Sequence, residues 1–125
     1  MLLHLLAIAL AAAAGALARF GVGVLAARLL GERFPLGTLA VNVLGCLLAG
    51  LVVGLAARRD ALSPELRLVI TVGFLGSFTT FSAFGVEVMS LSRQEGAGIA
   101  AAYVALSVAL SLAGVFVGEA LARPA

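Results

Sequence analysis

Long apolar runs alternate with short charged breaks along the chain. The apolar runs cover about 2–27, 36–57, 63–91 and 98–121, and each is longer than the roughly 20 residues that cross a bilayer as a helix. The third run opens on Ser63, Pro64 and Glu65, a capping residue followed by proline at the first helical turn. Because the breaks are only about eight residues long, the pattern predicts one compact all-α domain, 1–125, of four transmembrane helices.

The composition also indicates a membrane protein. Of the 125 residues, 63% are apolar and 11% are charged, which is too little polar surface for a water-soluble globule of this length. The single cysteine, Cys46, lies in an apolar run, so it forms no disulfide within the chain and suits a small buried position. The net charge of +2 is spread without a basic block, and we expect no nucleic-acid partner. The sequence thus predicts a multi-pass protein of the cell membrane.

The arginines in the breaks give almost no signal for orientation. With a cytoplasmic N-terminus, the inside would carry Arg58, Arg59, Arg67 and Arg123, and the outside would carry Arg28, Arg33 and Arg93. Four against three permits insertion either way up, and hence an antiparallel homodimer of two oppositely inserted copies. The alternative is a single orientation set by the pair Arg58 and Arg59.

Two GxxxG spacings permit close contact between helices. They are Gly50 to Gly54 in the second run and Gly114 to Gly118 in the fourth. In a chain with fifteen glycines such spacings also arise by chance, so we expect these glycines to serve packing without a specific role in a dimer.

Polar side chains form stripes along two of the predicted helices. Thr38 and Asn42 lie four residues apart on one face of the second helix, which Gly45 continues. The fourth helix carries a hydroxyl at every fourth position: Tyr103, Ser107 and Ser111. An isolated serine or threonine in a membrane usually bonds a carbonyl of its own helix. An asparagine amide has two donors and an acceptor that one turn cannot all satisfy, so Asn42 requires partners elsewhere.

The segment GSFTTFSAF, residues 76–84, combines poor helix formers with residues that cap helix starts. It predicts that the third helix breaks at mid-membrane. A break leaves carbonyls on one side and N–H groups on the other without partners, and such ends bind cations and anions respectively. The alternative is a continuous helix whose small residues serve packing.

Two phenylalanines follow the predicted break. Phe81 and Phe84 are three residues apart and share a helix face. The edge of a phenyl ring is electropositive, so rings turned edge-on suit the passage of a small anion. Phenylalanines at this spacing are also common as core or lipid-facing residues.

Several segments together resemble the Fluc, or CrcB, family of fluoride channels, small four-helix proteins that form antiparallel dual-topology dimers. They are Arg19, GTLAVNVLG at 37–45, GFLGSFTTFSAFGVE at 73–87, and the hydroxyls at 103, 107 and 111. The resemblance spans essentially the whole chain. Ser77 stands where the family commonly has a second glycine and Ala83 where it commonly has threonine, and only the polar lining at Ala83 is affected.

This resemblance implies a passive channel that exports fluoride and protects the cell against its toxicity, without enzyme activity. The carbonyls of Gly76 and Thr79 from both subunits would hold a structural sodium ion at the dimer centre. Phe81 and Phe84 would line two pores, each built from both subunits. The polar track that replaces the water around fluoride would comprise Asn42, Thr38, Thr80, Ser82, Ser107 and Ser111, with Tyr103 nearby. Arg19 would attract anions into a wet vestibule, and Glu87 would lie near a pore end.

A proton-coupled transporter of the small multidrug type is the alternative, since that class also has four helices and dual topology. It would carry an acid deep in the first helix, where this chain has Arg19. A non-transporting accessory subunit is a third possibility, which the hydroxyl and phenylalanine stripes disfavour. The sequence contains no nucleophile–base pair, metal-ligand cluster or phosphate-binding loop that would indicate an enzyme.

Overall fold

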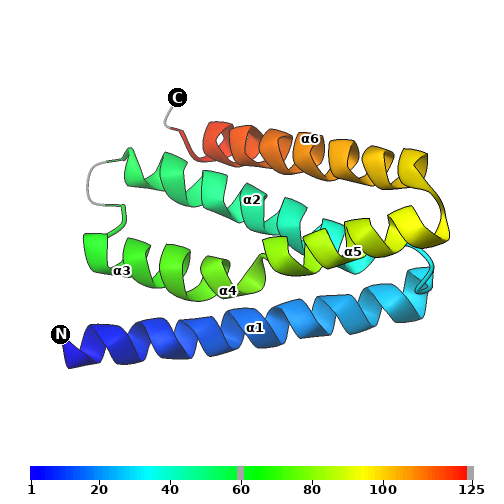
Figure 1. Ribbon diagram of the computed structural model, residues 1–125. Helices are drawn as coiled ribbons and strands as arrows, with labels where there is room; N and C mark the ends of the chain where they lie inside the picture. Colours follow the sequence, from blue (N-terminus) through cyan, green and yellow to red (C-terminus); the bar gives the residue numbers. More distant parts are fainter. Residues whose placement is uncertain (59–60, 124–125) are drawn as a thin grey trace.

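The computed structural model describes residues 1–58 and 61–123, and all regular structure within those ranges is helical. The elements in chain order are α1 (Leu2–Leu30), α2 (Leu36–Ala56), α3 (Pro64–Leu68), the π-helix η1 (Val69–Leu75), α4 (Gly76–Phe78), α5 (Phe81–Gln94) and α6 (Ala97–Ala122). In Figure 1 the elements α3, η1, α4 and α5 follow one another along a single rod, which we call the third rod and which lies between α1 and α2. Within the described residues, four helical segments are long and apolar enough to cross a membrane. The predicted all-α fold with four such segments is confirmed.

The helix ends largely follow from local sequence. Ser63 caps α3 as predicted, since its Oγ accepts the N–H of Leu66 at 3.2 Å. Helices α1 and α5 both run past the predicted ends, because Arg28 and Arg93 lie within their last turns and are not breaks. A cation in the last turn interacts favourably with the negative end of a helix dipole, so a charged residue there does not end the helix.

Helices α2 and α6 form the most extensive contact, and glycines allow it. A Cβ added to Gly50 would run into the main-chain carbonyl of Val115 on α6. A Cβ added to Gly118 would run into the carbonyl of Leu47 on α2. The two GxxxG segments therefore face each other within one chain, which confirms that these glycines serve packing.

A second close contact joins α1 to the third rod. Gly15 on α1 approaches the carbonyl of Phe74, and a Cβ there would lie 3.1 Å from the nitrogen of Phe78. In the opposite direction, a Cβ on Gly73 would lie 2.8 Å from the Cβ of Ala11 and 2.9 Å from the carbonyl oxygen of Ile8. The π-helix η1 and the short α4, which begins the segment 76–84, are thus held directly against α1.

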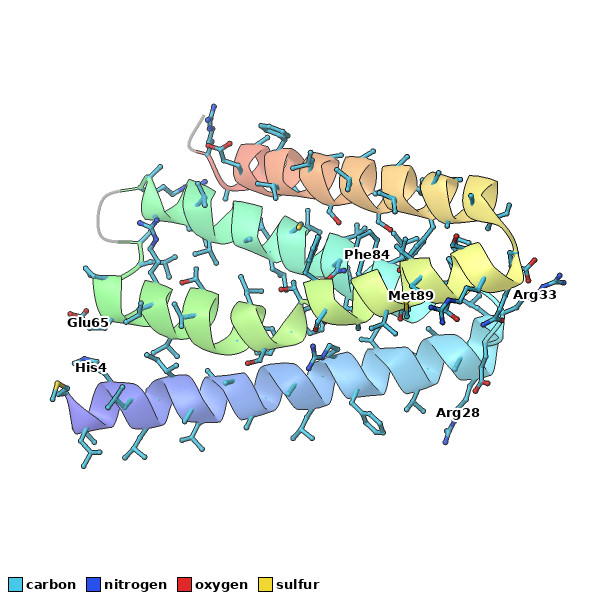
Figure 2. The ribbon with its side chains drawn as sticks, viewed as in Figure 1. His4, Arg28, Arg33, Glu65, Phe84 and Met89 are labelled. Carbon is cyan, nitrogen blue, oxygen red and sulfur yellow. The ribbon has the colours of Figure 1, made fainter. Side chains whose placement is uncertain are left out.

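Arginines lie at both ends of the bundle. Figure 1 places the start of α1 and the ends of α2 and α6 at one end of the bundle, where Arg58 Nη2 donates to the carbonyl of Arg123 at 3.2 Å. Arg28 and Arg33 lie at the opposite end (Figure 2), where Arg33 Nε donates to Glu95 Oε1 at 3.2 Å. Arg59, which could set the orientation together with Arg58, lies outside the described residues.

Candidate functional site

The third rod leaves the helical conformation at two residues, Thr79 and Thr80. Thr79 has φ −79° and ψ 159°, and Thr80 has φ −151° and ψ 124°, both extended. Helix α5 then starts with Thr80 as its N-cap, whose Oγ1 accepts the N–H of Ala83 at 3.2 Å. The π-helix η1 precedes the interruption, and such segments are frequent at functional sites. The segment 76–84 therefore contains two non-helical residues between α4 and α5.

Asn42 on α2 bridges this interruption with both ends of its amide. Its Nδ2 donates to the carbonyl oxygen of Thr80 at 3.0 Å, and its Oδ1 accepts the N–H of Thr80 at 2.9 Å. The prediction that Asn42 finds partners beyond its own turn is confirmed. The amide is held by the main chain, and only the second N–H of Nδ2 is left for any other acceptor.

Because the N–H groups of Thr80 and Ala83 bond side-chain oxygens, two main-chain carbonyls lack their helical hydrogen-bond donors. In a continuous α-helix, the N–H of Thr80 would bond the carbonyl of Gly76, and the N–H of Ala83 would bond the carbonyl of Thr79. Here the first N–H goes to Asn42 Oδ1 and the second to Thr80 Oγ1. Gly76 and Thr79 therefore lose their helical donors, and they are the two residues whose carbonyls the sequence resemblance assigned to a cation.

A shallow pocket of about 250 Å³, which we call the carbonyl pocket, opens beside these residues. Gly76 and Thr79 line it together with Gly45 and Cys46 from α2. Gly45 is required there, because a Cβ at this position would overlap Cγ2 of Thr79. The predicted stripe of Thr38, Asn42 and Gly45 on α2 thus lies against the break.

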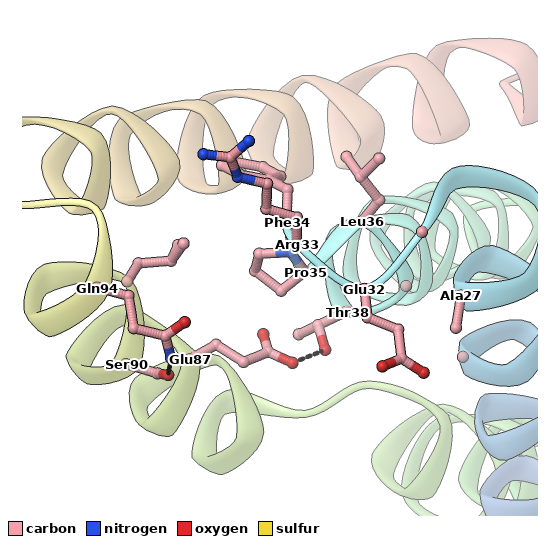
Figure 3. Close-up of a pocket in the computed structure, with 14 residues that line it drawn as sticks. Ala27, Glu32, Arg33, Phe34, Pro35, Leu36, Thr38, Glu87, Ser90 and Gln94 are labelled. Carbon is pink, nitrogen blue, oxygen red and sulfur yellow. Dashed lines mark hydrogen bonds between the residues drawn. The ribbon is translucent and has the colours of Figure 1, made fainter.

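Glu87 on α5 joins three helices through hydrogen bonds. Thr38 Oγ1 on α2 donates to Glu87 Oε1 at 2.6 Å, a bond that Figure 3 shows. Tyr103 on α6 donates its hydroxyl to Glu87 Oε2 at 2.9 Å and is fully buried, with 0% of its surface exposed. The two carboxylate oxygens are therefore each held by a different hydroxyl.

The rings of Phe81 and Phe84 differ sharply in exposure. Their centroids are 5.6 Å apart, and Phe84 also lies 5.3 Å from the ring of Tyr103. Phe84 is buried, whereas 83% of Phe81 is exposed on the single chain. Phe81 thus projects from the surface, next to the break.

Two larger pockets collect the other predicted residues. The aromatic pocket, about 310 Å³, is lined among others by Asn42, Thr80, Phe81, Phe84, Ser107 and Ser111. The arginine pocket, about 590 Å³, is lined among others by Arg19, Thr38, Thr80, Ser82 and Glu87. Thr80 lines both, so the break separates them. Ser107 is 5% exposed and its Oγ has no hydrogen-bond partner among the described residues.

Sequence reasoning missed one residue at this site. Phe34, in the connection between α1 and α2, packs edge-on against Tyr103, with ring centroids 5.3 Å apart and planes at 86°. It lines a third space of about 300 Å³, the loop-end pocket, together with Thr38, Glu87 and Gln94 (Figure 3). Phe34 directly precedes Pro35 in a short break, and no periodicity marks it.

The spans and the site together define a class. The chain is a multi-pass α-helical membrane protein with polar pockets around an interrupted helix, an arrangement found in proteins that move ions or solutes. The sequence model described as CrcB-like protein, Camphor Resistance (CrcB), matches residues 6–119. The chain therefore belongs to the CrcB family.

Relatives of the chain are named Fluoride-specific ion channel FluC. The relative from Rhizobium etli is 46% identical over 122 residues, which cover 98% of each chain. The relative from Agrobacterium fabrum is 44% identical over 122 residues, again 98% of each chain. The relative from Cereibacter sphaeroides is 48% identical over 124 residues, 98% of this chain and 97% of the relative.

Proposed function

We propose that the chain is a subunit of a passive, fluoride-selective channel that exports fluoride across the cell membrane and so protects the cell from its toxicity. The observation that carries the proposal is the similarity over nearly the full chain to proteins named as fluoride-specific ion channels. The arrangement of polar groups around the break supports it, because neutral amide and hydroxyl groups there offer hydrogen-bond donors to an anion.

Fluoride is small and strongly hydrated, so a narrow path must replace its water with donors while keeping each site weak enough to release the ion. The aromatic pocket offers the hydroxyl of Ser107, which has no hydrogen-bond partner in the described part of the chain, together with the hydroxyl of Ser111 and the remaining N–H of Asn42. The electropositive edges of Phe81 and Phe84 add to these donors. Larger anions would be excluded by the bore and by their weaker hydrogen bonds.

The arginine pocket suits the approach of an anion. Arg19 is half-buried on α1 and shares this pocket with the hydroxyls of Thr38 and Ser82. A guanidinium in a polar hollow raises the local concentration of anions. We therefore assign this pocket to a vestibule, with Glu87 at the end of the pathway nearer the connections.

A second copy of the chain would complete the pathway. The break lies near the middle of a 31-residue span, Pro64–Gln94, so it would sit at mid-membrane. The exposed Gly76, whose carbonyl has lost its helical donor, and the hydroxyls of Ser107 and Ser111 in the open aromatic pocket would then face hydrocarbon, which polar groups avoid. Arginines at both ends of the bundle favour two copies inserted in opposite directions.

The carbonyls of Gly76 and Thr79 fit a structural sodium ion at the centre of such a dimer. Each has lost its helical donor, and unwound carbonyls are the groups with which membrane proteins coordinate sodium. Two subunits would supply four carbonyl oxygens. When bound, the ion would neutralise their partial negative charge and join the two breaks.

Efflux from liposomes tests the function. Protein reconstituted into liposomes loaded with fluoride or chloride should release fluoride rapidly and retain chloride, while protein-free liposomes retain both. Proton-coupled uptake of cationic drugs with no passive fluoride leak would instead support the small multidrug-type transporter. For the dimer, a C-terminal tag should be accessible from both faces of sealed vesicles, and access from one face alone would exclude dual topology.

A further inference from the structure

We propose that Phe34 is a positioning residue of the ion pathway, whose ring fixes Tyr103 and, through Tyr103, the carboxylate of Glu87. The inference rests on the proposed function, since it assigns a role within the same pathway. Phe34 donates no hydrogen bond to the pathway and lines neither the aromatic nor the arginine pocket. Its effect would be transmitted entirely by packing.

Tyr103 is held between two rings. Phe34 lies edge-on to it, with centroids 5.3 Å apart and an angle of 86°, and Phe84 lies against it at 5.3 Å and 44°. Edge-to-face pairs have a preferred geometry that aliphatic side chains of similar volume do not reproduce. Together the two rings fix the plane of the phenol, and the phenol hydroxyl then lies 2.9 Å from Glu87 Oε2.

The segment 34–38 acts on both oxygens of Glu87. Its first residue, Phe34, packs on the tyrosine that donates to Oε2, and its last, Thr38, donates directly to Oε1 at 2.6 Å. The N–H of Leu36 donates to the carbonyl of Phe34 at 2.7 Å, so the turn itself ties the ring to the start of α2. The end of the connection and the first turn of α2 thus together set the position of the whole carboxylate.

The ring also closes the loop-end pocket on the side of Tyr103. Phe34 lines that pocket and touches Tyr103, whereas Tyr103 does not line it. A smaller side chain at 34 would let water from the pocket reach the bond between Tyr103 and Glu87. That water would compete for the hydroxyl of Tyr103, which is fully buried in the wild type, and would weaken its alignment with Glu87.

The test compares Phe34→Leu with Phe34→Tyr in the fluoride efflux assay, with rates expressed per folded protein from gel filtration. We expect Phe34→Leu to slow efflux roughly tenfold and Phe34→Tyr, which keeps the ring, to stay within about twofold of the wild type. The matched control is Phe116→Leu, a phenylalanine on α6 that is 68% exposed, and it should leave efflux unchanged. Phe34→Met is measured in parallel, with the same expectation as Phe34→Leu, in case one of the two folds poorly.

A double-mutant cycle separates positioning from general packing. Tyr103→Phe keeps both aromatic contacts but removes the hydroxyl that bonds Glu87. If Phe34 acts through that hydroxyl, Phe34→Leu should slow efflux by less than about twofold in the Tyr103→Phe background. An equal tenfold loss in both backgrounds, or a Phe34→Leu protein as fast as wild type, would overturn the inference. Wild-type protein without fluoride efflux would instead overturn the proposed function.

Discussion

Replacing Asn42 by alanine removes both hydrogen bonds that hold the break. In the wild type these bonds join the Asn42 amide to the N–H and carbonyl of Thr80 at 2.9 and 3.0 Å. Each bond contributes about 1 kcal/mol net, and a buried group left unpaired costs about 1–3 kcal/mol. In Asn42→Ala the N–H of Thr80 has the carbonyl of Gly76 as its helical alternative, so the helix can continue through the break. A loss of about 2 kcal/mol shifts the balance from broken to continuous backbone by roughly thirtyfold.

Fluoride efflux from liposomes measures the consequence. We expect Asn42→Ala to conduct at least tenfold more slowly than the wild type per folded protein. The matched control is Leu44→Ala on the same helix, because Leu44 is 45% exposed and lines none of the three larger pockets. That variant should stay within about twofold of the wild type, as surface substitutions usually do.

The carbon-13 chemical shift of the Gly76 carbonyl reports the break independently of flux. In Asn42→Ala this shift should move towards the value of a hydrogen-bonded helical carbonyl. Efflux at the wild-type rate would refute the whole argument. Slow efflux with an unchanged Gly76 shift would show that Asn42 acts on the ion directly and not through the main chain of Thr80.

Three further results are expected. Phe81→Ala should slow fluoride efflux while the proposed dimer stays assembled in gel filtration, and unchanged flux would show that Phe81 is not part of the proposed pathway. Gly50→Ala should lower the melting temperature strongly, because the added Cβ would run into the main chain of α6. Gly85→Ala, whose added Cβ has nothing within 4 Å, should leave the melting temperature unchanged, and equal melting temperatures for the two variants would refute the packing of α2 on α6. Thr38→Val removes one hydroxyl from Glu87, a bond of about 1 kcal/mol, and should slow efflux several-fold; an unchanged rate would show that the carboxylate needs only Tyr103.

The spans could be predicted because hydropathy and length are local properties. Four apolar runs of bilayer length appear in the sequence, and four helical segments of that kind occupy the described residues. The predicted ends fall short of the observed ones at Arg28 and Arg93, because a charged residue does not by itself end a helix. The glycine pairs were correctly assigned to packing, but their partner helix is set by the tertiary fold.

The structure brings several of the predicted site residues into one pocket, but their hydrogen bonds could not be predicted from the sequence. The sequence predicts that the amide of Asn42 needs partners outside its own turn, because one turn cannot satisfy its two donors and its acceptor. That its partner is the main chain of Thr80, 38 residues away, depends on how α2 crosses the third rod. The π-helix η1 has no recognisable pattern in the sequence. The contact between Phe34 and Tyr103 depends on the position of α6, which the sequence pattern does not give. Both arise from contacts between segments distant in the chain.

A neutral amide suits the break better than a charged side chain would. The N–H and carbonyl of Thr80 require one acceptor and one donor, and Asn42 offers both without a net charge. A carboxylate or guanidinium in its place would need a counter-charge in the membrane and would repel or trap a passing anion. Because Asn42 takes the N–H of Thr80, the carbonyl of Gly76 is free to turn towards the carbonyl pocket. One side chain thus stabilises the interruption, and it leaves the carbonyl of Gly76 available on the side where we propose that the cation binds.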